Sequence, residues 1–98
     1  MKYMQSSKKS MLNKKSQLLK IIGKIIKKHR LATKKGILLH AYEFDIPSSS
    51  LNLIERGIRD PQITTLWKIA NSFDMTFGEF INEIEKQLPN DFTLIEDK

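Results

Sequence analysis

The 98-residue sequence has no cysteine, only four glycines and three prolines, and no acidic residue before position 37. Without cysteine, the chain can form neither a disulfide framework nor a thiolate zinc site, and small secreted domains usually need one of these. No run approaches the roughly 18 apolar residues of a membrane span, and the N-terminal residues lack the apolar centre of a signal peptide. These absences predict a soluble, one-domain protein of the reducing cytoplasm that does not enter a membrane.

The residue patterns on which enzymes depend are absent as well. The sequence contains no glycine-rich phosphate loop, no cysteine nucleophile and no histidine pair at metal-ligand spacing. A metal site built from His29, His40 and a nearby carboxylate is conceivable, but no ligand spacing supports it. We therefore expect no catalytic activity, no cofactor and no bound metal.

Charge is distributed unevenly along the chain. Residues 1–36 carry twelve lysines and arginines and no acid, whereas residues 37–98 carry five basic and eleven acidic residues. Clustered lysines favour partners that carry phosphate, either nucleic acid or anionic lipid, because neutralised phosphates release counterions. A solubilising tail has the same composition, so charge alone does not identify the ligand.

Composition divides the chain into three parts. Residues 1–16 are rich in Ser, Lys, Asn and Gln, and they offer little apolar surface to offset the entropy lost on ordering. They are expected to form a flexible basic arm. A helical body is predicted over residues 17–88, with Ser16 as the N-cap of its first helix. Residues 89–98 form a C-terminal tail with a brief apolar centre, FTLI.

Apolar residues spaced three and four positions apart predict five helices. The third is expected to begin at Ser48, because Pro47 forces Ile46 into an extended conformation and suits the start of a helix. Asp45 is expected in the left-handed conformation between the second and third helices. The segments are SQLLKIIGKIIKKHR, ILLHAYEF, the stretch from 48 to about 56, ITTLWKIANSF and TFGEFINEIEKQL.

Two helix ends carry further signals. Gly57 can cap the C-terminus of the third helix in the left-handed conformation, and Thr76 is expected to be the N-cap of the fifth. Trp67 lies among apolar residues at helical spacing and is expected in the core. Together these segments predict an all-α protein whose second and third helices are joined by a tight turn.

The stretch IPSSSLNLIERGIRDPQITTLWKIANSFDMTFGEF resembles the lambda-repressor-like, or Xre, family of helix-turn-helix proteins. The segments IERG, RDP, LWKIANSF and TFGEF follow the family pattern in order and spacing, and the resemblance covers roughly residues 18–84. It implies a compact five-helix lambda-repressor-like domain that binds operator DNA, usually as a dimer. The recognition helix would span about residues 48–56 and enter the major groove.

The resemblance also implies which residues contact DNA. Short polar side chains at the leading end of the recognition helix would reach base edges, Leu53 would touch a thymine methyl, and two arginines would contact phosphates. Alternatively, the serines only cap the helix and Arg56 is a solvated surface charge. Glu55 is expected to form a structural pair with Arg30. The implied DNA-binding residues are Ser48, Ser49, Ser50, Asn52, Leu53, Arg56 and Arg59.

The sequence departs from the family between residues 29 and 40. Gly36 and Ile37 occupy positions where members have a Ser or Thr cap and a phosphate-gripping glutamine, so the usual anchor of the second helix is missing. His29 and His40 occupy positions that are normally apolar. Either these histidines are partly buried with satisfied polar atoms, or the register slips and Leu38 faces the core.

The sequence thus predicts a sequence-specific transcriptional regulator that binds double-stranded DNA, a dimeric repressor that reads the major groove. The homodimer interface is expected at the last helix and the tail, around Phe80, Ile84 and Leu88.

Two alternatives stay open. A protein-interaction module or antitoxin-type partner protein could retain the helix-turn-helix fold and use it to hold another protein, which the missing anchor and the FTLI tail would suit. A basic protein of the membrane surface would require Ile22 and Ile26 to be exposed.

Overall fold

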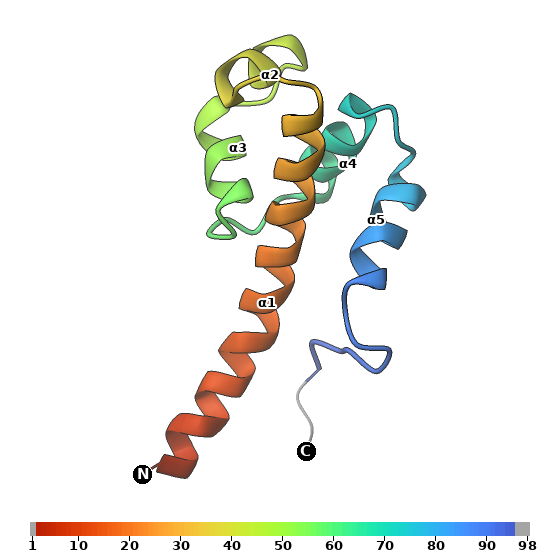
Figure 1. Cartoon of the computed structure of the whole chain (residues 1–98). Coiled ribbons are helices and arrows are strands. Elements are labelled where there is room, and N and C mark those ends of the chain that lie inside the picture. The colour runs from red at the N-terminus through yellow and green to blue at the C-terminus, as the bar shows by residue number, and fades with distance from the viewer. Residues whose placement is uncertain (1, 96–98) are drawn as a thin grey trace.

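A computed structural model describes residues 2–95, with side chains from residue 14 onward, and this part of the chain contains five helices and no strand. Figure 1 shows a long first helix with the four shorter helices gathered around its C-terminal half. The all-α five-helix prediction is confirmed. The helices are α1 (Lys2–Ala32), α2 (Ile37–Glu43), α3 (Ser48–Glu55), α4 (Ile63–Ser72) and α5 (Phe77–Lys86).

The hydrophobic core lies where four of the helices meet. Ile26 of α1, Leu51 of α3, Ile69 of α4 and Phe80 of α5 are all fully buried. Burial of this kind stabilises a fold by roughly 1.5–3 kcal/mol for each large apolar side chain. Ile22 is buried with them, so the membrane-surface interpretation, which requires exposed isoleucines on this helix, is wrong. No helix within the described residues is long and apolar enough to cross a membrane.

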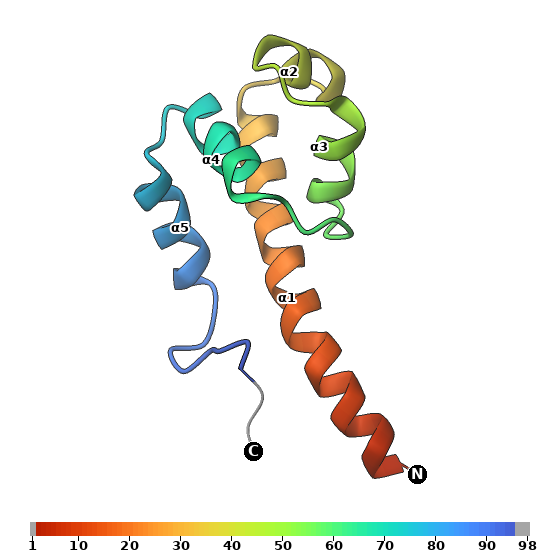
Figure 2. The same cartoon turned by 180° about the vertical axis from the view of Figure 1, so that it is seen from behind.

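Helix α1 begins much earlier than predicted. It starts at Lys2, so Ser16 lies inside the helix and is not its N-cap. The lysines and methionines before position 17, with Gln5 and Leu12, are good helix formers, and no Gly or Pro interrupts the segment, which favours continuation of the helix. At 1.5 Å per residue α1 is about 46 Å long, and its N-terminal half extends beyond the other four helices (Figures 1 and 2). The flexibility of the arm, residues 1–16, stays a prediction.

The turn between α2 and α3 has the predicted geometry. Asp45 has a φ of 56°, which confirms the left-handed conformation. The backbone N–H of Ile46 donates to the carbonyl of Ala41 at 2.9 Å, and Pro47 stands at the N-cap of α3. Ala41 is buried, and its small side chain lets the two helices approach closely.

Glycines bring α1 and the end of α3 together. A Cβ added to Gly23 would lie 2.4 Å from the carbonyl oxygen of Glu55 and 2.6 Å from that of Ile54. Only a residue without a side chain permits this approach. Gly57, just after α3, has a φ of 74°, so the predicted left-handed C-terminal cap is confirmed.

The C-terminal helices give one confirmation and two corrections. Thr76 caps α5 and forms a capping box with Glu79, as its sequence position predicts. The expectation that Trp67 lies in the core is wrong: its side chain is half exposed and stacks on Phe77 with 4.6 Å between ring centroids. Helical spacing alone does not tell a core position from the edge of the buried face.

The predicted dimer interface needs a second correction, at one residue. Phe80 is fully buried inside the single chain, so it is not available to a second copy. Ile84 is almost fully buried but lines an open groove, and an interface at the end of α5 and the tail stays a prediction. Leu88 is half buried and packs against the same core. The apolar face of α5 is wide because it covers α1 and α4 within one molecule.

Candidate nucleic-acid interface

Helix α3 presents a polar stripe to solvent. Ser49, Asn52 and Arg56 are all exposed, and their spacing of three and four residues places them on one side of the helix. Ser48 and Leu53 are partly exposed beside this stripe. The opposite side carries Leu51 and Ile54 into the core, so the helix has one packed face and one free face.

The loop after α3 carries the second predicted arginine. Arg59 Nη1 donates to Ser50 Oγ at 3.0 Å, so these two residues contact each other on the flank of α3. An open hollow of about 450 Å³ lies here, and Gln62 at the start of α4 also lines it. The guanidinium and the amide give this flank donors that suit a phosphate group, and Asp60 places one carboxylate at the same hollow.

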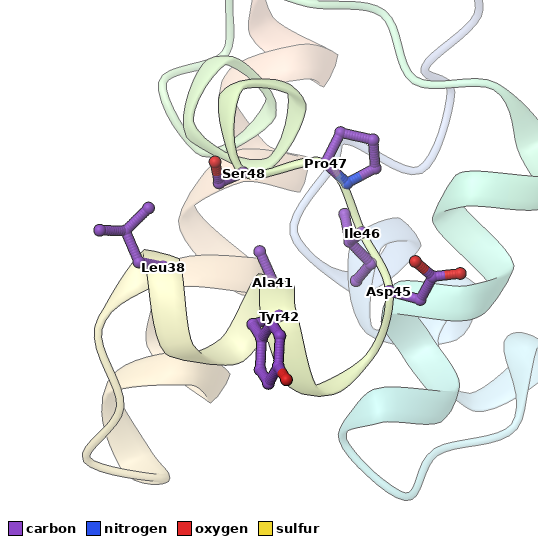
Figure 3. Close-up of a pocket in the computed structure, with 7 residues that line it drawn as sticks. All are labelled: Leu38, Ala41, Tyr42, Asp45, Ile46, Pro47 and Ser48. Carbon is purple, nitrogen blue, oxygen red and sulfur yellow. The ribbon is translucent and has the colours of Figure 1, made fainter.

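The other flank of α3 has a different chemistry. A hollow of about 800 Å³ lies between α2 and the start of α3 (Figure 3), and it contains no lysine or arginine. Its lining includes Leu38, Tyr42 and Asp45 together with Ser48. An anionic backbone would find a carboxylate and apolar groups here instead of positive charge.

The structure shows what replaces the missing anchor of the second helix. Gly36 is the N-cap of α2 and makes no side-chain capping bond. Leu38 is 74% exposed, so the alternative register in which Leu38 faces the core is wrong. Tyr42, one turn further on, is 85% exposed and also lines the hollow (Figure 3). Sequence reasoning missed Tyr42, although its spacing of four from Leu38 places the two on one face.

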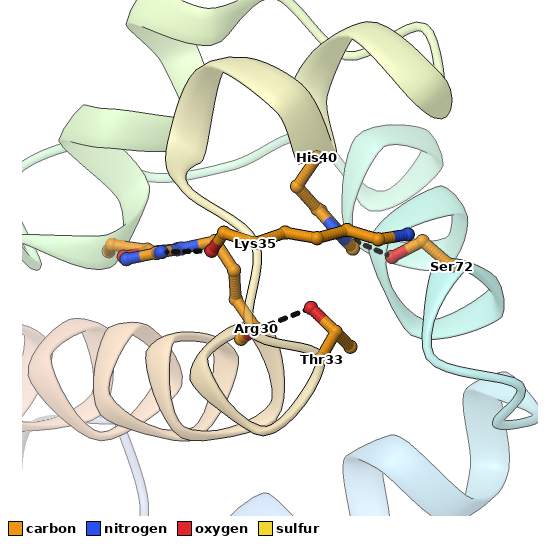
Figure 4. Close-up of polar contacts among 6 residues, drawn as sticks. Arg30, Thr33, Lys35, His40 and Ser72 are labelled. Atoms are coloured by element: carbon orange, nitrogen blue, oxygen red, sulfur yellow. Dashed lines mark hydrogen bonds and ion pairs between the residues drawn. The ribbon is translucent and has the colours of Figure 1, made fainter.

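Arg30 and Glu55 form the pair that the resemblance implied. Arg30 Nε donates to Glu55 Oε2 at 2.6 Å and Nη2 donates to Oε1 at 2.9 Å, with both side chains almost fully buried. The hydrogen bond to Glu55 raises the pKa of Arg30. Arg30 Nη1 also donates to the carbonyl of Lys35 at 2.8 Å (Figure 4). One guanidinium therefore joins α1, the end of α3 and the loop before α2.

His40 holds α2 against α4. Its Nε2 lies 2.9 Å from Ser72 Oγ (Figure 4), and that hydroxyl itself donates to the carbonyl of Ile69 at 2.6 Å. The Nε2 atom therefore carries the proton and donates to Ser72, while the buried Nδ1 has no hydrogen-bond partner. Burial first, and then the positive charge of Lys35, lower the pKa of His40. The buried imidazole packs on Phe73 with 4.9 Å between ring centroids.

His29 has a different environment from His40. Its Nε2 lies 2.8 Å from Glu83 Oε1, and Lys28 Nζ donates to the other oxygen of that carboxylate, also at 2.8 Å. Burial acts to raise the pKa of Glu83, but the hydrogen bonds from Lys28 and His29 hold it below its ordinary value. Neither histidine belongs to a cluster of three or more potential metal ligands among the residues that the structure describes.

Comparison with known families assigns this part of the chain. Residues 40–80 match the Helix-turn-helix family model, a span that runs from the second half of α2 through α3 and α4 into α5. This segment is therefore similar to the lambda-repressor-like, or Xre, helix-turn-helix family, whose members are DNA-binding regulatory domains. No curated protein and no solved structure matches the chain.

Proposed function

We propose that the protein is a sequence-specific DNA-binding transcriptional regulator that inserts the N-terminal half of α3 into the major groove. The polar stripe on α3 carries this proposal, because Ser49 and Asn52 lie exposed on a helix whose other face is packed. Short hydroxyl and amide side chains let the backbone approach base edges and hydrogen-bond to them. Ser48 contributes at the leading end, and Leu53 contacts a thymine methyl group.

Phosphate contacts flank this stripe in the proposed complex. Arg56 continues the exposed stripe towards the end of α3, and Arg59 lies beside Ser50 at the hollow that Gln62 also lines. These donors would fix the position of α3 on the duplex without reading its sequence. The eleven lysines among positions 1–36 add attraction that does not depend on the DNA sequence.

The proposed protein acts as a dimeric repressor in the cytoplasm. Residues 17–88 form the DNA-binding body, residues 1–16 the basic arm and residues 89–98 the tail. Two copies related by a two-fold axis would place their recognition helices in half-sites about 34 Å apart. A protein bound across promoter DNA in this way excludes polymerase, which is why repression is the expected effect.

Binding to DNA from upstream of the protein's own gene tests the proposal, with random DNA of the same length as the control. Both are measured over a range of salt concentrations. A regulator should prefer the upstream DNA strongly at physiological salt, since base contacts survive there better than phosphate contacts. Equal binding to both DNAs, falling steeply with salt, would contradict sequence-specific regulation.

A protein-interaction module on the same fold is the competing function. The exposed Leu38 and Tyr42, where an anchor to phosphate would be expected, favour it. Replacing Ser49 and Asn52 by Glu distinguishes the two functions. These replacements abolish binding to the operator if α3 reads DNA, and they leave partner binding intact if the chain chiefly holds another protein.

A further inference from the structure

An open apolar groove lies on the side of the molecule formed by α1, α5 and the tail. Its volume is about 680 Å³. Side chains of α1, α5 and the tail line it, and Leu94 of the tail is 52% exposed although it is apolar. The apolar lining includes Leu18, Ile22, Ile81, Leu88, Phe92 and Leu94.

The N-terminal half of α1 is the second feature on which the proposal rests. Figures 1 and 2 show that it extends past the other four helices from both viewing directions. A polar helix of about fifteen residues is only marginally stable in water by itself, so most of its stability has to come from packing. In the sequence, Met4, Met11, Leu18 and Ile25 recur every seven residues, the spacing that helix-to-helix contacts use.

The helical extension is strongly basic, and the edge of the groove offers it carboxylates. Residues 2–15 contain five lysines and no acid. Glu85 and Lys86 both line the groove, and the exposed Asp91 lies between two further lining residues, Asn90 and Phe92. An apolar floor with Glu85 and Asp91 at its edge suits a helix that carries apolar residues among lysines.

The extension cannot occupy the groove of its own chain. Leu18 and Ile22, which line the groove, belong to the same continuous helix, so residues 2–15 lead away from the groove (Figure 1). We propose that the groove binds residues 2–15 of a second copy of this chain, with the two α1 helices crossing antiparallel. Each copy then fills the groove of the other, as a two-fold axis requires.

Reciprocal exchange doubles the contact that one helix makes. Residues 2–15 form a helix only about 21 Å long, and one short helix buries little area beside the roughly 800 Å² that each partner buries in a standard interface. A two-fold dimer makes this contact twice and adds the crossing of the two α1 helices. This inference deepens the dimer in the proposed function and rests on it. It is tested without DNA, so failure of this interface and failure of DNA binding are distinguishable.

Two single-cysteine chains provide the test, since the natural sequence has no cysteine. A Lys8→Cys chain and an Asp91→Cys chain, made distinguishable by a mass tag, are mixed and treated with a short thiol-reactive crosslinker. The expected main product joins one chain of each kind, because position 8 of one copy lies near position 91 of the other. A predominance of products from two identical chains, or of uncrosslinked chains, would overturn the proposal.

Charge exchange gives an independent measurement by sedimentation equilibrium. The unaltered chain should approach twice 11.4 kDa as its concentration rises. The double variant Glu85→Lys/Asp91→Lys should raise the dimer dissociation constant at least about fivefold, because each change acts twice in a two-fold dimer. Adding Lys8→Glu/Lys9→Glu to the same chain should restore much of the affinity. A mass fixed at 11.4 kDa, or a charge exchange that restores nothing, contradicts this interface.

Discussion

The two ends of α3 differ in the burial and the hydrogen bonding of their side chains. At its C-terminal end Glu55 is buried in a two-hydrogen-bond pair with Arg30, and the backbone touches Gly23 of α1. At its N-terminal end Pro47 replaces a side-chain cap, and Ser49 stands exposed with no hydrogen bond from its side chain to the described residues.

This difference shows how a helix of eight residues can be held in position at one end and still have unpaired polar side chains at the other. The pair at the C-terminal end sets the direction of the helix, so Ser49 needs no side-chain contact of its own to be held in place. Hydrogen-bonding groups that are unpaired in the free protein remain available to base edges. The predictions below disturb first the fixed end and then the free end.

The buried ion pair should give the largest effect. Replacing Glu55 by Ala leaves the Arg30 guanidinium buried without its partner, and we expect a loss of about 3–5 kcal/mol in the free energy of unfolding. Urea denaturation followed by circular dichroism measures it. The matched control, Arg30→Met/Glu55→Leu, removes both charges and should lose much less. A loss below about 1 kcal/mol in the single variant would show that the pair does not anchor α3.

Gly23→Ala should be next in size. The added Cβ would clash with two backbone carbonyls at the end of α3, and overpacking of this kind costs about 1–3 kcal/mol. Alanine is the better helix former by up to about 1 kcal/mol, so a net loss of stability can only come from the clash. Gly78→Ala, also within a helix, is the control, because the nearest atom to its added Cβ is Thr76 Oγ1 at an ordinary contact distance of 3.9 Å. Equal thermal stability of the two variants would contradict the close approach of α1 and α3.

Changes at the free end should affect DNA binding and leave stability unaltered. Ser49→Glu places a carboxylate against the bases and removes a hydrogen-bonding hydroxyl, a loss of about 1–3 kcal/mol in operator affinity, or roughly 5- to 150-fold. Gln87→Glu adds the same charge at the end of α5 and should change affinity little. Fluorescence anisotropy with labelled operator measures both. If the two variants lose affinity equally, net charge rather than the position on α3 is responsible.

Acid should loosen the attachment of α2 before it affects α3. The pKa of buried His40 is lowered from its ordinary value of 6.5, so the unfolded chain takes up the proton more readily than the folded one. This contribution to stability is constant above about pH 6.5 and decreases as the pH falls below it. Unfolding measured from pH 8 to pH 5 should show the decline. A His40→Phe chain keeps the ring stacking but has no group that titrates at this position, so most of the decline in stability should disappear. If His40→Phe shows the same decline as the unaltered chain, the prediction is contradicted.

Arg56→Gln should have the smallest effect. One lost phosphate contact reduces the negative slope of log affinity against log salt by about 0.9 and weakens binding to all DNA sequences alike. Operator and random DNA are compared in the same salt series. An unchanged slope would make Arg56 a solvated surface charge, the alternative that its exposure also allows.

Local sequence signals predicted the parts of the fold that depend on a few neighbouring residues. The start of α3 after Pro47, the left-handed Asp45 and the Thr76 cap follow from backbone preferences that the rest of the structure does not override. Arg30 and Glu55 are 25 positions apart in the sequence, and their contact could be predicted only from the resemblance to a family.

Features that depend on what covers a helix were not predictable in the same way. The start of the first helix was predicted from its apolar residues, and these show only which part of the helix is buried. The helix continues back to Lys2 through polar residues that are compatible with a helix but do not signal one. Trp67 has core spacing, yet α5 covers only one side of its ring. The exposure of Tyr42 depends on how α2 rests on α4 through His40, a contact that no local pattern shows.

The most direct test of the two-ended helix is a nuclear magnetic resonance titration of the whole chain with operator DNA, in which the backbone amide shifts are followed residue by residue. The account predicts the largest shifts at residues 48–53 and 59–62, with small shifts at Gly23 and along the tail. Shifts confined to the lysines of α1 or to the groove beside α5, with residues 48–53 unchanged, would contradict recognition of DNA by α3.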